Sequence, residues 1–240
     1  MKEYRLLEIQ SHIERNDLLY PLDILLVGAT GTGKSSTLNA LFNTPIAKIG
    51  YGVNPETQEI AAYPLHDYLR IHDSAGLGDG KVNDLKHTKN ITSTLLETRT
   101  IDDVDWGFID LVMVILDGGS RDLGTTFNLI EHTILKSIEP QRVIVVINQA
   151  DMAMKGRNWN SGFNKPEPDL IDFLEEKASS IKGRINESTG LTIRKPVYYS
   201  AKYEYNINAL IDHIIDHFPT KRRIPTKPSF AGLPWFLGGL

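Results

Sequence analysis

Apolar positions along the chain alternate between short continuous runs and longer segments with helical spacing. Continuous runs of Val, Ile and Leu predict strands covered on both faces, because such strands have no solvent-facing side to leave polar. Apolar residues at intervals of three and four predict helices between them. The predicted strands cover residues 24–27, 68–72, 111–116, 143–147 and 197–199, and the predicted helices cover residues 34–42, 90–101, 125–137, 169–188 and 206–218.

This alternation predicts an α/β fold of three layers, in which helices flank a mostly parallel central sheet. Ligands of such sheets bind beyond the carboxyl ends of the strands, so the loops after the runs are the places to search. An amphipathic N-terminal packing helix is expected within residues 1–20, the main domain within residues 21–219, and a tail at residues 220–240. Residues 152–168 form a long connection of a kind that tends to be functional or mobile.

Composition excludes several classes of protein. The chain has 240 residues, of which 41% are apolar and 23% charged, which supports one buried core rather than a disordered chain. The absence of Cys excludes disulfides, thiolate zinc sites and a cysteine nucleophile, and it fits a reducing compartment. The N-terminal segment lacks the apolar core of a signal peptide, and the apolar stretch at 228–240 is shorter than a membrane span. We therefore expect a cytoplasmic protein.

Charge is distributed unevenly along the chain. There are 26 Lys and Arg against 30 Asp and Glu, a net charge of −4. Residues 220–240 carry four of the bases and no acid, which leaves 22 bases against 30 acids for the rest. The acidic body argues against general nucleic-acid or membrane binding. The basic, proline-rich and partly apolar tail has three open roles: folding back on the domain, docking on a partner, or touching an anionic membrane.

The first predicted strand leads into Gly-Ala-Thr-Gly-Thr-Gly-Lys-Ser, which matches the phosphate-binding pattern G-x-x-x-x-G-K-[ST] at a strand-to-helix junction. Glycines let backbone N–H groups wrap around phosphate oxygens, and the helix start adds the positive end of its dipole. We expect Lys34 to neutralise the β- and γ-phosphates and Ser35 to supply a hydroxyl to Mg²⁺. The alternative is a glycine turn with an accidental lysine. The expected nucleotide-binding residues here are Gly28, Thr30, Gly31, Thr32, Gly33, Lys34, Ser35 and Ser36.

Another predicted strand ends in His-Asp73-Ser-Ala-Gly76. Asp73 is expected to accept a hydrogen bond from a Mg²⁺-bound water, and the Gly76 amide to donate to a γ-phosphate that approaches too closely for a side chain. This D-x-x-G pattern alone is common and is also compatible with a plain turn. Its position after an apolar strand and before a Gly-rich stretch favours a switch that orders around the γ-phosphate.

The predicted strand at 143–147 ends in Asn148-Gln149-Ala-Asp151. A carboxylate there can accept two hydrogen bonds from the N–H and the exocyclic amine of guanine, a pair that adenine does not present. Such a site discriminates strongly because the wrong base leaves buried polar groups unpaired. After the last predicted strand, Ser200-Ala201-Lys202 offers a backbone amide to the guanine carbonyl oxygen.

Together with Thr57, which lies between the first and the second, these four motifs resemble the five ordered motifs of the translation-factor class of P-loop GTPases, in its Era/EngA/MnmE-like branch with small bacterial, often prophage-associated members. The resemblance covers residues 24–218 and implies a G domain that binds GTP or GDP with Mg²⁺. It also implies that Thr57 belongs to the first switch, where its hydroxyl binds Mg²⁺ and its carbonyl helps to place the attacking water. Lys34, Thr57 and Gly76 are then the expected catalytic residues, and Ser35, Thr57 and Asp73 the metal ligands.

Three positions depart from the pattern of related GTPases. Gln149 stands where many members have Lys, which shortens the aliphatic stem that stacks on the base. Leu77 occupies the place of the water-positioning Gln of Ras-like members, so slow intrinsic turnover is expected. Gly31 stands where potassium-activated members carry Asn, which argues against a potassium-assisted dimer.

Arg121, in the loop after the run at 111–116, is a hypothetical source of acceleration. It would supply charge in trans across a nucleotide-dependent homodimer; the alternative is a solvated loop arginine.

Two further groups have mainly structural interpretations. His213 and His217 have the spacing of a metal pair but are predicted on a solvated face with Asp212 and Asp216.

A basic, aromatic group lies in the connection at 152–168. Its residues fit RNA binding by charge and stacking, but a surface loop with one anchoring aromatic is favoured. They are Lys155, Arg157, Trp159 and Phe163.

The leading hypothesis is a GTP-hydrolysing switch that acts on an unidentified protein effector. The first alternative is a GTP-dependent scaffold that binds nucleotide and hardly hydrolyses it. A second alternative is an ATPase in which the resemblance of residues 148–151 to a guanine motif is coincidental. The RNA-binding domain that follows the G domain of Era-like proteins has no counterpart in residues 220–240, so ribosome binding by that route is not supported.

Overall fold

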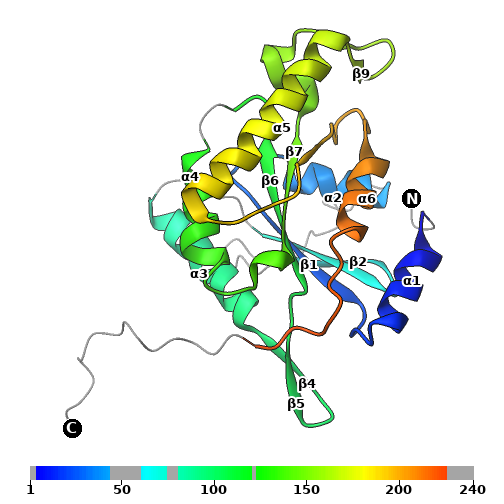
Figure 1. The fold of residues 1–240 in the computed structure, drawn as a ribbon, viewed down its shortest axis with the longest axis vertical. Coiled ribbons are helices and arrows are strands. Elements are labelled where there is room, and N and C mark those ends of the chain that lie inside the picture. The colour runs from blue at the N-terminus through cyan, green and yellow to red at the C-terminus, as the bar shows by residue number, and fades with distance from the viewer. Residues whose placement is uncertain (1–3, 44–60, 75–80, 121–122, 226–240) are drawn as a thin grey trace.

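The computed structural model describes residues 4–43, 61–74, 81–120 and 123–225. A six-stranded sheet lies at its centre with helices on both faces (Figure 1). The strand order is β10-β7-β6-β1-β3-β2, and every pairing is parallel except that of β2 with β3. This confirms the predicted three-layer α/β fold. The strands are β1 (Leu22–Val27), β2 (Ala61–His66), β3 (Leu69–Asp73), β6 (Leu111–Asp117), β7 (Val143–Asn148) and β10 (Val197–Tyr198).

The predicted helices are all present; the one at 34–42 has the predicted ends, and the others differ at one or both ends. In the fourth, the α-helix continues into a π-helical turn, Ile130–Ile134, rather than running uniformly to Ser137. Short 3₁₀ turns occur at Pro140–Arg142 and Ala150–Gly156. Among the described residues, no helix combines the length and apolar character of a membrane span. The helices are α1 (Leu6–Arg15), α2 (Lys34–Phe42), α3 (Lys81–Leu96), α4 (Gly124–Leu129), α5 (Pro168–Thr189) and α6 (Ile207–Ile215).

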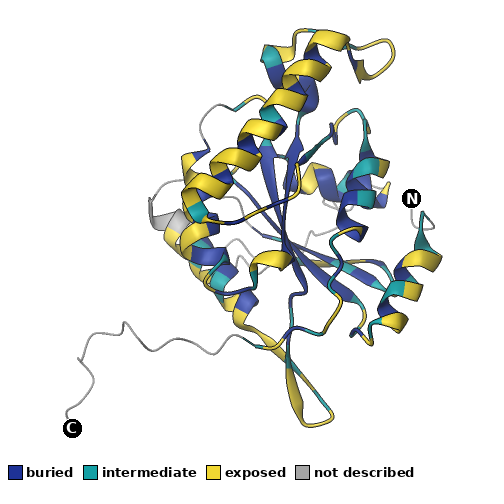
Figure 2. Ribbon diagram, viewed as in Figure 1, coloured by how far each residue is buried: buried dark blue, intermediate teal, exposed yellow. Residues whose placement is uncertain are grey.

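The central strands are buried along their whole length, as their continuous apolar runs predict (Figure 2). Alternate residues of β1 enter different clusters: Ile24 packs with α1, α2 and α6, whereas Leu25 packs with α3, α4 and α5. The sheet therefore separates two hydrophobic cores. Burial on both faces fixes the position of each central strand within the sheet. The loops after β1, β3, β7 and β10 therefore converge at one edge of the sheet.

Two elements differ from the sequence prediction. The helix predicted over 90–101 ends at Leu96, and Thr98–Ile101 is instead strand β4, paired with β5 (Val104–Gly107). The reversal occurs at Asp102 and Asp103, which both have left-handed φ angles of 52° and 61° and so form the tight turn of a hairpin. Edge strand β2 was not predicted, because its alternating exposure and its proline give no continuous apolar run.

The connection at 152–168 has one anchoring aromatic residue, as predicted. Its hairpin, β8 (Trp159–Asn160) with β9 (Lys165–Pro166), is held by Trp159, whose ring lies 5.2 Å from that of Tyr203 and 5.6 Å from that of Tyr205. Phe163, at the turn, is 74% exposed. Trp159 therefore anchors the connection to the loop after β10.

The first residues of the predicted tail are packed against the domain. Arg223 is 1% exposed, and its guanidinium donates to the carbonyl oxygens of Ile109 at 2.9 Å, Ser137 at 3.0 Å and Leu95. The Gly107 amide donates to the Arg223 carbonyl at 2.8 Å. Folding back on the domain is thus confirmed for residues 220–225, whereas Lys227 and the rest of the tail lie outside the described residues.

The prediction that His213 and His217 lie on a solvated face is wrong. His213 is 8% exposed, and its ring lies 4.4 Å from the half-buried ring of His217. The buried face of helix α6 is wider than the face formed by its apolar residues alone. This burial lowers the pKa of His213 to about 4. Within the described residues, no cluster of three or more His, Asp or Glu side chains could hold a metal ion.

Candidate functional site

The loop between β1 and α2 wraps around the side chain of its own lysine. Lys34 is 8% exposed, and its Nζ donates to the carbonyl oxygens of Gly28 at 3.1 Å and Ala29 at 3.2 Å. The same loop is closed by Thr32, whose hydroxyl donates to the Ala29 carbonyl at 2.9 Å. These contacts hold the ammonium group at the start of α2, where the helix dipole also favours an anion.

Gly33 cannot be replaced by a residue with a side chain without disturbing the site. Its φ angle is +83°, and a Cβ atom there would lie 2.3 Å from Nδ2 of Asn148. Only glycine therefore allows the phosphate loop and the loop after β7 to approach this closely. The sequence pattern assigns this glycine to phosphate binding, and the structure adds its contact with the end of β7.

Ser35 and Asp73 meet at the edge of the phosphate loop. Ser35 Oγ donates to Asp73 Oδ2 at 3.1 Å, which joins α2 to the end of β3. The other carboxylate oxygen, Oδ1, is buried and has no hydrogen-bond partner among the described residues, and burial raises the pKa of Asp73. A hydroxyl beside a carboxylate oxygen that lacks a partner is a donor set that suits Mg²⁺, which prefers hard oxygen ligands.

Asn148 connects the phosphate loop to the loop after β10. It is 2% exposed; its Nδ2 donates to the Thr32 carbonyl at 3.0 Å, and its Oδ1 accepts from the Ala201 amide at 3.0 Å. Gln149 makes a second link, since its Nε2 donates to the Gly31 carbonyl at 2.6 Å. The three loops predicted to bind one ligand are thus joined through the end of β7.

Asp151 is oriented by Ser200. It is 5% exposed, and its Oδ1 accepts a 2.6 Å hydrogen bond from Ser200 Oγ. The Ala201 amide, predicted to reach a guanine carbonyl, here donates to Asn148. Lys202 is exposed, and its Nζ lies 4.9 Å from the centre of the Tyr203 ring. The hydrogen bond from Ser200 therefore fixes the direction of the carboxylate.

One pair in this site, Thr37 and Tyr199, was not predicted from the sequence. Tyr199 is fully buried, and its hydroxyl lies 2.8 Å from Thr37 Oγ1, which in turn donates to the Gly33 carbonyl at 2.8 Å. The only signal was indirect: Tyr199 directly precedes the Ser200 motif, and Thr37 lies one turn into the predicted helix.

Some of the remaining predicted site residues lie within the described residues, and others do not. Thr30 is exposed in the phosphate loop, and Ser36 is exposed in the first turn of α2. Thr57, Gly76, Leu77 and Arg121 lie outside the described residues, so their predicted roles remain predictions.

A profile of the family described as 50S ribosome-binding GTPase matches residues 23–149. The match contains the phosphate loop, Asp73 and Asn148, and it ends before Asp151. It confirms, at the level of the family, the resemblance drawn from the motifs. A comparison with curated protein sequences finds no match.

Several solved structures share the fold. Toc33 from Arabidopsis thaliana in complex with Mg²⁺ and GMPPNP has a TM-score of 0.57 and 14% identity, over 90% of this chain and 91% of that chain. A structure published with the finding that dimerization is important for the GTPase activity of the chloroplast translocon components atToc33 and psToc159 has a TM-score of 0.59 and 17% identity, over 90% of each chain.

Two matched structures are longer than this chain. LeoA, a bacterial dynamin GTPase from ETEC, has a TM-score of 0.54 and 16% identity, over 90% of this chain and 39% of LeoA. Era from Aquifex aeolicus has a TM-score of 0.47 and 20% identity, over 82% of this chain and 56% of Era. The chain thus spans only part of the length of either protein.

Proposed function

The chain belongs to the GTPase family described as 50S ribosome-binding GTPase, and from this premise we propose that it binds GTP and hydrolyses it slowly to GDP and phosphate. The observation that carries the proposal is the position of Asn148, whose side chain bonds to the phosphate loop on one side and to Ala201 on the other. A single buried amide thereby sets the distance between the proposed phosphate site and the proposed base site.

Each described group has a proposed role at the phosphates. Lys34 and the amides of residues 28–36 bind the β- and γ-phosphates, and the buried lysine neutralises charge that develops during phosphoryl transfer. Ser35, Thr57 and Asp73 hold Mg²⁺, a proposal supported by the Asp73 oxygen that has no partner among the described residues. When bound, the cation neutralises charge on the phosphate oxygens. Asp73 and Gly76 sense the γ-phosphate, and the Thr57 carbonyl helps to place the attacking water.

Guanine selection is proposed for Asp151. Its carboxylate, oriented by Ser200, accepts from the two donors on one edge of guanine, while Gln149 and Lys202 flank the base. Because Asp151 is buried, a base without those donors leaves the carboxylate unpaired, which is costly.

Slow turnover and regulation complete the proposal. Leu77 cannot orient water as a glutamine does, so acceleration must come from a partner. We propose a nucleotide-dependent homodimer in which Arg121 supplies charge, and an unidentified protein effector that recognises the GTP state. The association of dimerization with GTPase activity in Toc33 and psToc159 supports this choice. A cytoplasmic location is part of the same proposal.

The base proposal is tested with Asp151→Asn in the full chain. We expect GTP affinity to fall by at least about tenfold, because the amide offers a donor where guanine also offers one. Affinity for xanthosine triphosphate should rise, since xanthine carries an acceptor at that edge. Unchanged preference would contradict the guanine assignment, and equal affinity of the wild type for ATP and GTP would favour an ATPase.

Hydrolysis is tested separately by single-turnover measurement with Mg²⁺ and excess protein. Phosphate release that disappears in Lys34→Ala supports the enzyme. Tight GTP binding without phosphate release, at any protein concentration, supports the GTP-dependent scaffold instead.

A further inference from the structure

A groove runs along one side of α5, outside the nucleotide site. One part, of about 630 Å³, lies between the loop after β6 and the connection after β7 and is lined by Gly118, Met154, Lys155, Arg157, Phe173 and Lys177. A second part, of about 310 Å³, continues from Phe173 and Lys177 toward α4. The two parts share these two side chains, so they form one continuous surface, which we call the α5 groove.

The α5 groove combines apolar and cationic side chains. Phe173 is 38% exposed at its centre, and Arg184 adds a fourth cation to Lys155, Arg157 and Lys177. Glu176 is the one carboxylate among the described residues that line it. No described carboxylate forms an ion pair with Lys155 or Arg157. The groove therefore suits an anionic segment that also carries an apolar side chain.

The backbone that presents these cations is strained. Met154, Lys155 and Gly156 have successive left-handed φ angles of 52°, 60° and 77°. Two of the three are not glycine, and such residues persist in this conformation only where their surroundings over-determine it. The connection is held in place by Trp159, which packs on Tyr203 and Tyr205. The cationic rim of the groove is thus a fixed feature of the fold.

The opposite end of the molecule carries a segment with complementary chemistry. Hairpin β4–β5 projects away from the sheet, and its tip consists of Asp102, Asp103, Val104 and Asp105, all exposed (Figure 1). Val104 is 46% exposed. The basic residue of the hairpin, Arg99, faces inward to an ion pair with Asp23. The tip therefore presents three carboxylates around one apolar side chain.

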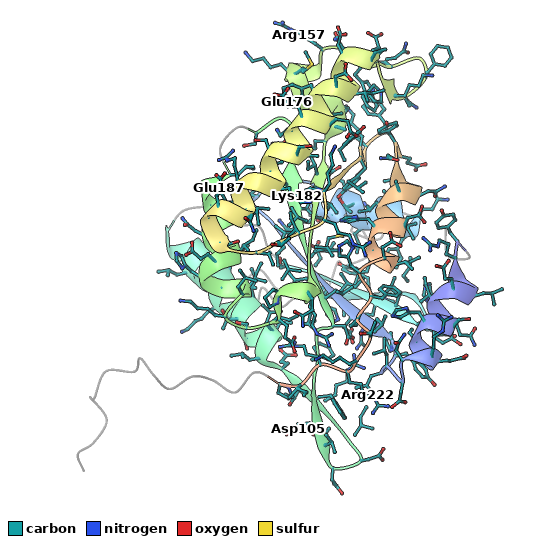
Figure 3. All side chains as sticks on the ribbon, in the orientation of Figure 1. Asp105, Arg157, Glu176, Lys182, Glu187 and Arg222 are labelled. Carbon is teal, nitrogen blue, oxygen red and sulfur yellow. The ribbon has the colours of Figure 1, made fainter. Side chains whose placement is uncertain are left out.

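The groove and the tip lie too far apart to meet within one molecule. Figure 3 shows Arg157 at one end of the molecule and Asp105 at the other. We propose that the hairpin tip of one copy of this chain docks in the α5 groove of a second copy. The carboxylates of Asp102 and Asp103 pair with Lys155 and Arg157, and Val104 packs on the apolar part of the groove.

Contacts between different surfaces of identical chains have a defined consequence. Such head-to-tail contacts produce open chains of subunits unless the rotation between copies closes a ring. The contact is small and charged, so we expect weak association that is sensitive to salt. It differs from a homodimer across the nucleotide face, because it uses neither the phosphate loop nor Arg121 and needs no nucleotide.

The test is sedimentation velocity of the full chain without nucleotide over a wide concentration range. For the wild type, we expect a sedimentation coefficient that rises past the value of a dimer and falls back to that of a monomer in high salt. The groove variant, Lys155→Glu with Arg157→Glu, should weaken association by at least about tenfold. The hairpin variant, Asp102→Asn, Asp103→Asn and Asp105→Lys, should do the same, and asparagine is chosen because it tolerates the left-handed turn.

An equimolar mixture of the two variants provides the decisive arm. The native hairpin of the groove variant fits the native groove of the hairpin variant, so the mixture should associate more strongly than either variant alone. The matched controls change the net charge equally on exposed faces outside both surfaces: Lys136→Glu with Lys182→Glu, and Glu131→Lys with Glu187→Lys. Circular dichroism checks that every variant is folded.

Three outcomes would overturn the proposal. If the wild-type chain remains monomeric at every concentration, the hairpin tip does not dock in the groove, and the groove suits some other acidic partner. Association that is unchanged in the groove and hairpin variants, or equally weakened in the controls, assigns it to another surface. Loss in both variants without recovery in the mixture shows that the two surfaces do not contact each other.

Discussion

The hydroxyl of Tyr199 donates to Thr37 Oγ1 at 2.8 Å inside the core, and that threonine hydroxyl donates onward to the Gly33 carbonyl at 2.8 Å. This relay connects the residue before the Ser200 loop to the glycine of the phosphate loop, in parallel with the bridge made by Asn148. Both proposed halves of the nucleotide site therefore rest on shared buried contacts rather than on independent loops.

Tyr199→Phe tests the relay. The variant removes one buried hydrogen bond while it keeps the ring, so we expect unfolding free energy to fall by about 1 kcal/mol and GTP affinity to fall with it. Urea unfolding and nucleotide titration measure the two effects, and a double-mutant cycle with Thr37→Val isolates the pair. Tyr20→Phe, at a position 63% exposed, is the control. Additive effects of the two variants would show that the relay carries no coupling.

A comparison of Gly33→Ala with Gly31→Ala separates the cost of backbone strain from the cost of a steric clash. Both glycines have left-handed φ angles, +83° and +82°, but a Cβ at Gly31 meets nothing described within 4 Å, whereas at Gly33 it meets Asn148. Each variant has the conformational cost of about 1–2 kcal/mol. Gly33→Ala should lose at least about 1 kcal/mol more and should bind GTP more weakly than Gly31→Ala. Equal losses would show that the close approach does not matter.

Asn148→Ala should affect stability more than Gln149→Ala. The buried Asn148 side chain satisfies the Thr32 carbonyl and the Ala201 amide, and its removal leaves both without that partner, at a cost of about 2–4 kcal/mol. The Gln149 contact with Gly31 is exposed, so its loss should cost about 1 kcal/mol or less. Thermal unfolding without nucleotide compares the two variants, and the reverse order would contradict the bridge.

Arg223→Ala should destabilise the domain by about 3 kcal/mol or more, because three buried carbonyl oxygens lose their donor. Its neighbour Arg222 pairs with Asp17 near the surface, so Arg222→Ala should cost about 1 kcal/mol or less. A chain that ends at Pro225 keeps every described contact of this segment, and one that ends at Pro219 loses them. Equal stability of the two truncated chains would contradict the structural role of Arg223.

His213 makes stability depend on pH. Its folded pKa of about 4 lies below the ordinary value of 6.5, so between these values the unfolded chain binds more protons than the folded one. Stability should therefore be complete above pH 6.5 and fall as pH decreases toward 4, by up to about 3 kcal/mol. His217 and Arg194 oppose protonation, and Asp216 favours it. Urea unfolding of His213→Leu should show a smaller loss than the wild type, with a remainder from His72, whose pKa burial also lowers to about 4. The exposed control His132→Leu should keep the full loss.

The sequence predicted the parts of the fold in which one physical signal dominates. The buried strands show it as continuous apolar runs, and the phosphate loop shows it as glycines at fixed spacing before Lys34. Hairpin β4–β5 was missed because apolar spacing was extended through Thr98–Ile101, although the Asp102-Asp103 pair is a tight-turn signal. Edge strand β2 lacks a dominant pattern, since one face is exposed.

Contacts between distant segments could not be predicted from local patterns. The three bases at 221–223 were treated as charge in a tail, yet the position of Arg223 is set by carbonyl groups on three distant segments, at Leu95, Ile109 and Ser137. The burial of His213 likewise depends on what covers α6. In the candidate site, the motifs identified Asn148 and Asp151. The Tyr199–Thr37 relay could not be predicted, because it depends on how the residue after β10 packs against α2.

The first and last described segments are joined to each other. Tyr4 and Arg5 bond to Asp212, His12 bonds to the Pro219 carbonyl, and Arg222 donates to the Asp17 carbonyl at 2.6 Å, all across more than 200 positions of sequence. Contacts of such separation are slow to form, because the intervening chain must first become compact. We therefore expect the joined ends to assemble late, and a circularly permuted chain that links them covalently to refold faster than the natural order in stopped-flow measurements.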